Sequence, residues 1–457
     1  MKRIASAALL LVLASTLVAV AAQQQPAYTS IQGTVHALQP KTGSFDVVTG
    51  VGMSLRIVHL VAPPAGEAAV PLSARPAPAT SVLLLVALVA SGCAKPVHPG
   101  DPISGLTAEQ RDRFRRGRAV FDSVFTPETG LGPLFNSAAC GECHEDPVSG
   151  GSGEEVEVHA TAFHADGNCD PLADQGGPVI QQDATPALKA ALGLDKEPLP
   201  KDATGRGLRT SLAIFGRGLL DAVPDSDIVS YADPDDRNHD GISGRVNRFV
   251  DGRIGRFGRK AFVPTLSEFN AGAFVIEQGI TNPAVPTEES IGGGPIPAGV
   301  DPAPDPEINQ EALDLTTDFV RFLAPPSPLR QTGAAGKGRH LFDQIGCASC
   351  HLPTLRTGKN SIRALDRKQF FAYTDLLVHD MGPDLADICL GLATPPEFRT
   401  EPLVGVRLAH HFLHDGRAAT LDQAIELHGG EGSGARDRFK ALTPKERDAV
   451  IAFLKTL

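Results

Sequence analysis

Residues 347–351 read Cys347-Ala348-Ser349-Cys350-His351, and the same order recurs at Cys140-Gly141-Glu142-Cys143-His144. Two thiols followed directly by an imidazole form the pattern for covalent haem attachment, in which the cysteines form thioethers and the histidine binds iron. A zinc knuckle would need a further Cys/His pair, and the sequence has no third Cys-x-x-Cys. We therefore predict two covalently bound haem c groups, with His144 and His351 as proximal iron ligands.

A short repeat precedes the two motifs. Gly117-Arg118-Ala119-Val120-Phe121-Asp122 comes before the first, and Gly338-Arg339-His340-Leu341-Phe342-Asp343 comes before the second. Capping signals that begin at Thr107, Thr420 and Thr443 predict helix starts, and residues 310–323 are predicted to form a helix. We expect a mainly α fold with two cytochrome c-like haem domains, residues 94–326 and 327–457, divided at the proline-rich residues 325–328.

Composition narrows the class of protein. A chain of 457 residues exceeds one ordinary core, and its 42% hydrophobic content is that of a globular protein. The formal net charge of -11 argues against nucleic acid as a partner, and it suits a basic electron donor. The absence of Trp and the presence of only three Met and three Tyr shorten the list of axial ligands and radical relays.

The first 93 residues carry two export-like signals. Lys2-Arg3, an apolar run over 8–20 and Ala21-Ala22 indicate a secretory signal peptide at 1–22, too short to span a membrane. Residues 23–74 form a small β-rich segment, with strands expected between 30 and 60. Residues 75–93 then resemble a bacterial lipoprotein signal that would place a lipid anchor at Cys93. Either a small domain was fused to a lipoprotein, or translation begins later, or this run is a short buried strand. We expect an exported, periplasmic protein.

Three cysteines remain outside the haem motifs: Cys93, Cys169 and Cys389. Their presence is compatible with an oxidising compartment. Cys169 and Cys389 form a disulfide or stay free, since the sequence cannot pair them.

Residues 236–242 have the spacing of a calcium loop. Oxygen ligands are expected from Asp236, Asn238 and Asp240, with the carbonyl of Ile242 as a further ligand. Asn247 replaces the usual Glu at the twelfth place, which predicts weaker binding or a site that is closed differently. The alternative is a plain Asx-rich turn.

Four stretches together resemble one known family: Leu134-Phe135-Asn136 before the first motif, and residues 232–244, 373–382 and 412–431. They are similar to the di-haem oxidoreductases grouped with peroxidases. More distantly, they are similar to the bacterial di-haem cytochrome c peroxidases and to the di-haem enzyme that matures methylamine dehydrogenase. The resemblance covers about residues 106–457.

The resemblance implies reduction of hydrogen peroxide at the first haem, with electrons delivered through the second from a small cytochrome or copper protein. It places Glu277 where the peroxidases keep a distal carboxylate that moves peroxide protons. It places His428 where they carry an axial Met, so bis-histidine iron with a lowered potential is expected at the second haem. Met381 competes for that role, and His159 and His164 are candidates to cap the first iron.

Each site residue also has an ordinary structural interpretation. Glu277 could be a solvated helix residue, His428 a surface histidine at a helix end, and Met381 a core residue. Two other functions stay open, namely a di-haem oxidase of a protein or organic substrate and a non-catalytic electron-transfer cytochrome. A high-spin component in the ferric or mixed-valence spectrum would distinguish the enzymes from the carrier.

Overall fold

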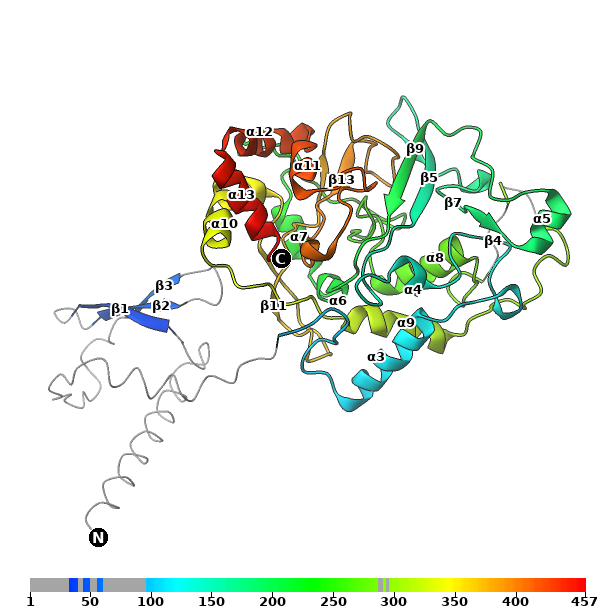
Figure 1. Cartoon of the computed structure of the whole chain (residues 1–457), viewed down its shortest axis with the longest axis horizontal. Helices are drawn as coiled ribbons and strands as arrows, with labels where there is room; N and C mark the ends of the chain where they lie inside the picture. Colours follow the sequence, from blue (N-terminus) through cyan, green and yellow to red (C-terminus); the bar gives the residue numbers. More distant parts are fainter. Residues whose placement is uncertain (1–32, 40–43, 50–55, 61–95, 287–290, 293–295) are drawn as a thin grey trace, which may run out of the picture. The chain divides into compact units, whose positions relative to one another are not determined.

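The computed structural model describes residues 33–39, 44–49, 56–60, 96–286, 291–292 and 296–457 (Figure 1). The chain divides into two compact units, Met1–Cys93 and Ala94–Leu457. The predicted signal peptide at 1–22, the lipoprotein-like segment at 75–93 and its Cys93 lie outside the described residues. Among the helices that are described, none is long and apolar enough to cross a membrane.

The described part of the first unit is a three-stranded antiparallel sheet, which supplies the strands expected between residues 30 and 60. Its order is β1-β2-β3. The strands are β1 (Gly33–Gln39), β2 (Ser44–Thr49) and β3 (Arg56–Leu60). The pairing of β1 with β2 shifts register between Val35 and Ala37.

The prediction of a mainly α fold is wrong, because the structure is only 32% helical with 14% strand. The chain holds 47 Gly and 37 Pro, and both residue types interrupt helices. Much of the second unit is therefore irregular backbone between short elements. One antiparallel sheet of order β6-β5-β7, with β9 also on β5, lies between the two haem motifs in sequence. Its strands are β5 (Val156–Phe163), β6 (Cys169–Asp170), β7 (Val179–Ile180) and β9 (Gly205–Thr210).

Three two-stranded pairs complete the described sheets of the second unit. They join β4 (Leu134–Phe135) with β8 (Asp183–Ala184), β10 (Thr354–Arg356) with β11 (Gln369–Phe371), and β12 (Val378–Asp380) with β13 (Glu397–Arg399). The helices before the second motif are α3 (Ala108–Phe121), α4 (Cys140–Cys143), α5 (Pro186–Leu192), α6 (Arg217–Asp221), α7 (Asp225–Tyr231), α8 (Leu266–Gln278), α9 (Gln310–Phe322) and α10 (Ala334–Gln344). After it come η3 (Cys347–Ser349), α11 (Leu421–Glu426), α12 (Ser433–Ala441) and α13 (Pro444–Leu454).

The predicted helix starts are confirmed at atomic level. Thr107 and Gln110 form a complete capping box at the start of α3. Thr420 accepts a hydrogen bond from the Gln423 amide at the start of α11, while the Gln423 side chain accepts from the amide of Ala419. These caps are local, so the sequence alone could place them.

The repeat before each haem motif forms the same packing unit twice. Helix α3 packs against α9, and α10 packs against α13 (Figure 1). A Cβ on Gly117 would lie 2.0 Å from the carbonyl oxygen of Leu315, and one on Gly338 would lie 1.8 Å from that of Ala449. Both glycines are therefore required for the close approach of two helices. The ring centroid of Phe121 lies 6.1 Å from that of His144, and that of Phe342 lies 6.4 Å from that of His351.

The largest hydrophobic core includes residues from both sides of the predicted boundary at 326, among them Phe121, Phe319, Leu355 and Leu376. A second core, which includes Phe342, Tyr373, Phe439 and Phe453, lies around α10 and α13. Cys169 and Cys389 form a disulfide that joins β6 to the segment before β13.

Candidate haem sites

The first motif forms a short helix that ends in the predicted ligand. Cys140 and Cys143 lie in α4, and His144 follows directly. The Nδ1 atom of His144 lies 3.2 Å from the carbonyl oxygen of Gly151, a contact that orients the ring. Burial lowers the pKa of His144, and the smaller opposing effect of the Gly151 carbonyl does not offset it. The buried imidazole is therefore neutral, which is the form that binds a metal.

Gly346 directly precedes the second motif, and its φ of 88° lets the chain turn from α10 into η3. The Nδ1 atom of His351 lies 2.9 Å from the carbonyl oxygen of Tyr373 and donates a hydrogen bond to it, which leaves Nε2 as the coordinating nitrogen. Burial lowers the pKa of His351 to about 4, so this imidazole is also neutral. Burial raises the pKa of the Cys347 thiol to about 12.

A cavity of about 700 Å³ adjoins the second motif. Its walls include Cys347, Cys350, His351 and the predicted sixth ligand His428. This volume is within the usual range for cofactor sites. Nδ1 of His428 donates to the carbonyl oxygen of Ala424 at 2.7 Å, leaving Nε2 for a metal, and burial lowers its pKa.

Met381 lines the same cavity and lies close to His428. A Cβ placed on Gly432 would be 3.1 Å from both the Cβ of His428 and the Cε of Met381. The structure thus brings together both candidate sixth ligands. The choice of His428 stays a prediction.

Glu277 lies near the first motif, at the C-terminal end of α8. Its half-buried carboxylate accepts a hydrogen bond from Asn136 Nδ2 at 2.7 Å. Burial raises the pKa of the Cys140 and Cys143 thiols to about 12, and the charge of Glu277 adds to that rise in both. The carboxylate is therefore close enough to act electrostatically on the haem-attachment residues.

The two histidines considered for the first iron lie apart in β5 and the turn after it. His159 Nε2 lies 3.1 Å from a carboxylate oxygen of Glu157, and the charges of His159 and His144 both lower the pKa of Glu157 against the effect of burial. Glu157 is thus near both rings. His164 is exposed.

The predicted calcium loop is a tight turn in which the carboxylate of Asp236 accepts hydrogen bonds from the amides of Asp240 and Gly241 at 3.0 and 3.2 Å. Asp240 and Ile242 also line the large cavity. Asn247 is fully buried and donates to the carbonyls of Lys260 and Leu390. It is therefore a structural residue, and it does not close the loop as a twelfth ligand.

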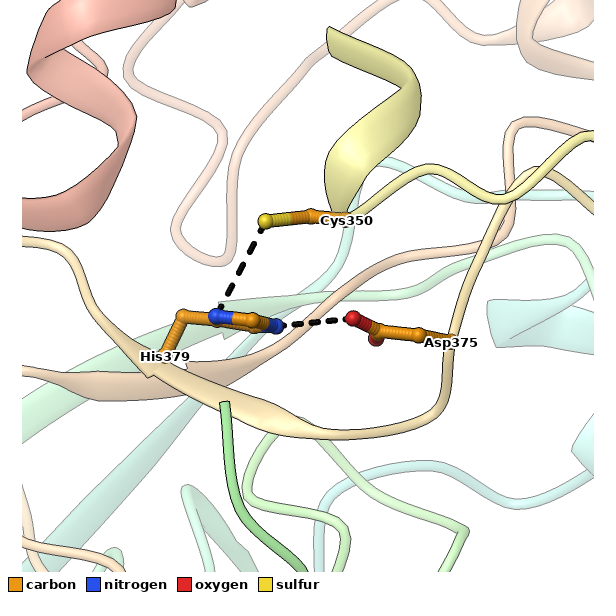
Figure 2. Close-up of side chains that lie close together, drawn as sticks. All are labelled: Cys350, Asp375 and His379. Atoms are coloured by element: carbon orange, nitrogen blue, oxygen red, sulfur yellow. Dashed lines mark hydrogen bonds and ion pairs between the residues drawn. The ribbon is translucent and has the colours of Figure 1, made fainter. Parts of the chain in front are cut away.

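Sequence reasoning gave no role to His379, which lies on β12 beside the second motif (Figure 2). Its Nε2 donates to Asp375 at 2.9 Å, its Nδ1 donates to Glu431 at 2.7 Å, and Nδ1 also lies 3.7 Å from Cys350 Sγ. Burial alone would lower the pKa of His379, but hydrogen bonds to Asp375, Cys350 and Glu431 raise it well above its ordinary value. His379 is therefore a buried imidazolium between two carboxylates.

Comparison with known proteins identifies the family. A family model described as "Di-haem oxidoreductase, putative peroxidase" matches residues 190–457, more than half of the chain. The chain belongs to this di-haem oxidoreductase family. The matched residues include the second motif, Glu277, His428 and the calcium loop, whereas Cys140, Cys143 and His144 precede them.

The fold also has a weak similarity to a solved structure of Kuenenia stuttgartiensis hydrazine synthase, determined under xenon pressure. The sequence identity is 14%, the alignment covers 87% of this chain and 100% of that chain, and the TM-score is 0.37. No curated protein matches the sequence.

Membership of a di-haem family implies two haems, and the residues present fit them. At the second motif, two thiols and a neutral imidazole line a cavity that is also lined by His428, which follows the end of α11. At the first motif the two thiols of α4 and the neutral imidazole of His144 directly after it are also together.

Proposed function

We propose that this di-haem oxidoreductase is an exported c-type peroxidase that reduces hydrogen peroxide at the first haem, with electrons delivered through the second from a small redox protein. Haem, when bound, would supply the iron at which the peroxide bond is cleaved and would pass on the electrons that the redox protein delivers. Glu277 would supply a proton-transfer group at the first haem, and His351 and His428 would both hold the iron of the second.

The position of Glu277 carries the proposal. Its carboxylate is half-buried, anchored by Asn136 and close to both thiols of the first motif. A carboxylate in such a place can accept a proton from one peroxide oxygen and return it to the other as the O–O bond breaks. A non-catalytic electron-transfer cytochrome would not need a proton-transfer group at this position.

The second site supports the other half of the proposal. His351 and His428 are both neutral, each is oriented through Nδ1 by a backbone carbonyl, and both line one cavity. Two imidazole ligands would leave no exchangeable position on that iron, and this suits electron transfer better than substrate binding.

Export is supported by the disulfide between Cys169 and Cys389, because such bonds persist in oxidising compartments. A lipid anchor at Cys93 and calcium at residues 236–242 belong to the same proposal. The turn geometry of Asp236 and Asp240 supports calcium at that place.

Peroxide turnover by the mixed-valence protein, with a reduced small cytochrome as donor, tests the function. Glu277→Gln should slow turnover by about 10²-fold, the usual scale for loss of an acid-base group, while both haem spectra stay as in the parent. Glu268→Gln, at the other end of α8 and paired with Arg253, is the matched control and should keep parental turnover. Parental turnover by Glu277→Gln, or spectra without any high-spin component, would contradict the proposal.

A further inference from the structure

Three arginines surround one glutamate in the second unit. Arg217 Nη2 lies 2.7 Å from Glu401 Oε1, Arg399 Nη2 lies 2.5 Å from Oε2, and Arg259 Nη1 lies 3.9 Å from Oε2. We call these four residues the Glu401 cluster. One carboxylate among three guanidinium groups leaves an excess of two positive charges. Because Arg217 and Arg399 are buried and the other two residues are half-buried, such an excess is costly unless an anion offsets it.

The Glu401 cluster lies near both haem motifs. Arg259, Arg399 and Glu401 line the large cavity together with Cys347 and His428. The charge of Arg217 also contributes to the lowered pKa of His144, after the larger effect of burial, so Arg217 lies near the first motif. The excess charge therefore faces the space in which the second haem would be held.

Two buried donors, on residues that line the cavity, have no hydrogen-bond partner among the described residues. They are Nη1 of Arg399, whose side chain is only 2% exposed, and Oγ of Ser211, a residue that is 7% exposed. Other unpaired polar atoms exist in the described part of the chain, but among the residues that hold them only Arg399 and Ser211 line the cavity. Leaving a buried donor unpaired costs roughly 1–3 kcal/mol, and more for a charged group, so such atoms in a native structure point to a missing ligand.

We propose that the Glu401 cluster binds a propionate carboxylate of the second haem, with Arg399 Nη1 and Ser211 Oγ as donors. This rests on the proposed covalent attachment of haem at Cys347 and Cys350. A carboxylate matches both observations, because it carries the negative charge that the cluster lacks and accepts several hydrogen bonds. A water molecule would satisfy the donors without offsetting the charge.

This contact has a consequence for the second iron. A ferric haem carries one more positive charge than a ferrous haem, so cationic groups held near it favour the ferrous form. Arg399 adds a positive charge and also offsets the negative charge of the propionate. Both effects raise the reduction potential of the second haem, and loss of Arg399 should lower it.

Potentiometric titration of the haem-loaded full chain tests the proposal. Arg399→Gln should lower the midpoint potential of the second haem, Ser211→Ala should lower it less, and Arg399→Lys should recover part of the Arg399→Gln shift. The matched control is Arg256→Gln. Arg256 is also buried and also has an unpaired guanidinium nitrogen, but it bonds to the carbonyls of Leu220, Asp221 and Val223, away from the cavity. Equal shifts in Arg256→Gln and Arg399→Gln would overturn the proposal, as would a parental potential in Arg399→Gln.

A crystal structure of the haem-loaded protein gives a second test that does not depend on the folding of any variant. A propionate oxygen should lie about 3 Å from Arg399 Nη1 or Ser211 Oγ. Propionates that both bind elsewhere, with water on these two donors, would refute the assignment. Neither measurement uses peroxide, so the propionate assignment can be supported or refuted independently of the proposed peroxidase activity.

Discussion

Replacing Glu401 with Gln should destabilise the protein by a predictable amount. Burial alone would raise the pKa of Glu401, but Arg399, Arg217 and Arg259 lower it from 4.5 to about 2. Each unit of pKa difference between the folded and unfolded states corresponds to about 1.36 kcal/mol. The ionised carboxylate therefore contributes roughly 3 kcal/mol to the free energy of unfolding.

The depressed pKa also predicts a pH dependence. A group whose pKa is lowered on folding stabilises the protein above its unfolded value, and this contribution is lost as the pH falls through the folded value. The contribution of Glu401 should therefore be complete above about pH 4.5 and should decline towards pH 2. Because Gln cannot ionise, the variant should lack this part of the acid dependence.

Urea denaturation of the parent and of Glu401→Gln at pH 7 and pH 3 measures both effects. We expect a difference of about 3 kcal/mol at pH 7 that becomes smaller at pH 3. Glu268→Gln is the matched control, because its pair with Arg253 is exposed and should contribute less than about 1 kcal/mol. Equal unfolding free energies for the parent and Glu401→Gln at pH 7 would refute the assignment of a half-buried, ionised Glu401.

Three further predictions concern single residues. Cys389→Ser should lower the free energy of unfolding by about 5 kcal/mol on the chain-entropy estimate for a disulfide, since the bridge spans 220 residues, and reductant should then have no further effect on the variant. His428→Ala should convert the low-spin spectrum of the second haem to high-spin. Leu427→Ala, at the neighbouring residue that is 38% exposed, should leave the spectrum low-spin. An unchanged spectrum in His428→Ala would make Met381 the sixth ligand instead. Asp240→Ala should weaken calcium binding, as measured by titration calorimetry. Asp235→Ala, in which the replaced side chain is 73% exposed, should bind calcium as the parent does. Equal calcium affinities of Asp240→Ala and the parent would show that the loop is a plain turn.

Local sequence determined the haem-attachment motifs, the helix starts and the paired helix packing. Cys-x-x-Cys-His and the caps at Thr107 and Thr420 each depend on residues within a few positions of one another. The repeated Gly-x-x-x-Phe-Asp pattern predicts the same helix packing at both places, because Gly117 and Gly338 are both needed for close helix contact. The same local signals led to the wrong fold class, since a well-capped helix says nothing about the length of irregular backbone between helices.

Only the tertiary structure decided which distant residues meet. His379 reaches Glu431 across 52 positions, Arg217 reaches Glu401 across 184, and Cys169 reaches Cys389 across 220. Asn247 has the spacing of a calcium ligand, yet it is fully buried and bonds to Lys260 and Leu390 instead. Short elements joined by irregular chain have no periodicity that predicts such pairings. Their energies come from burial and from the offsetting of charge, and neither exists until the chain has folded.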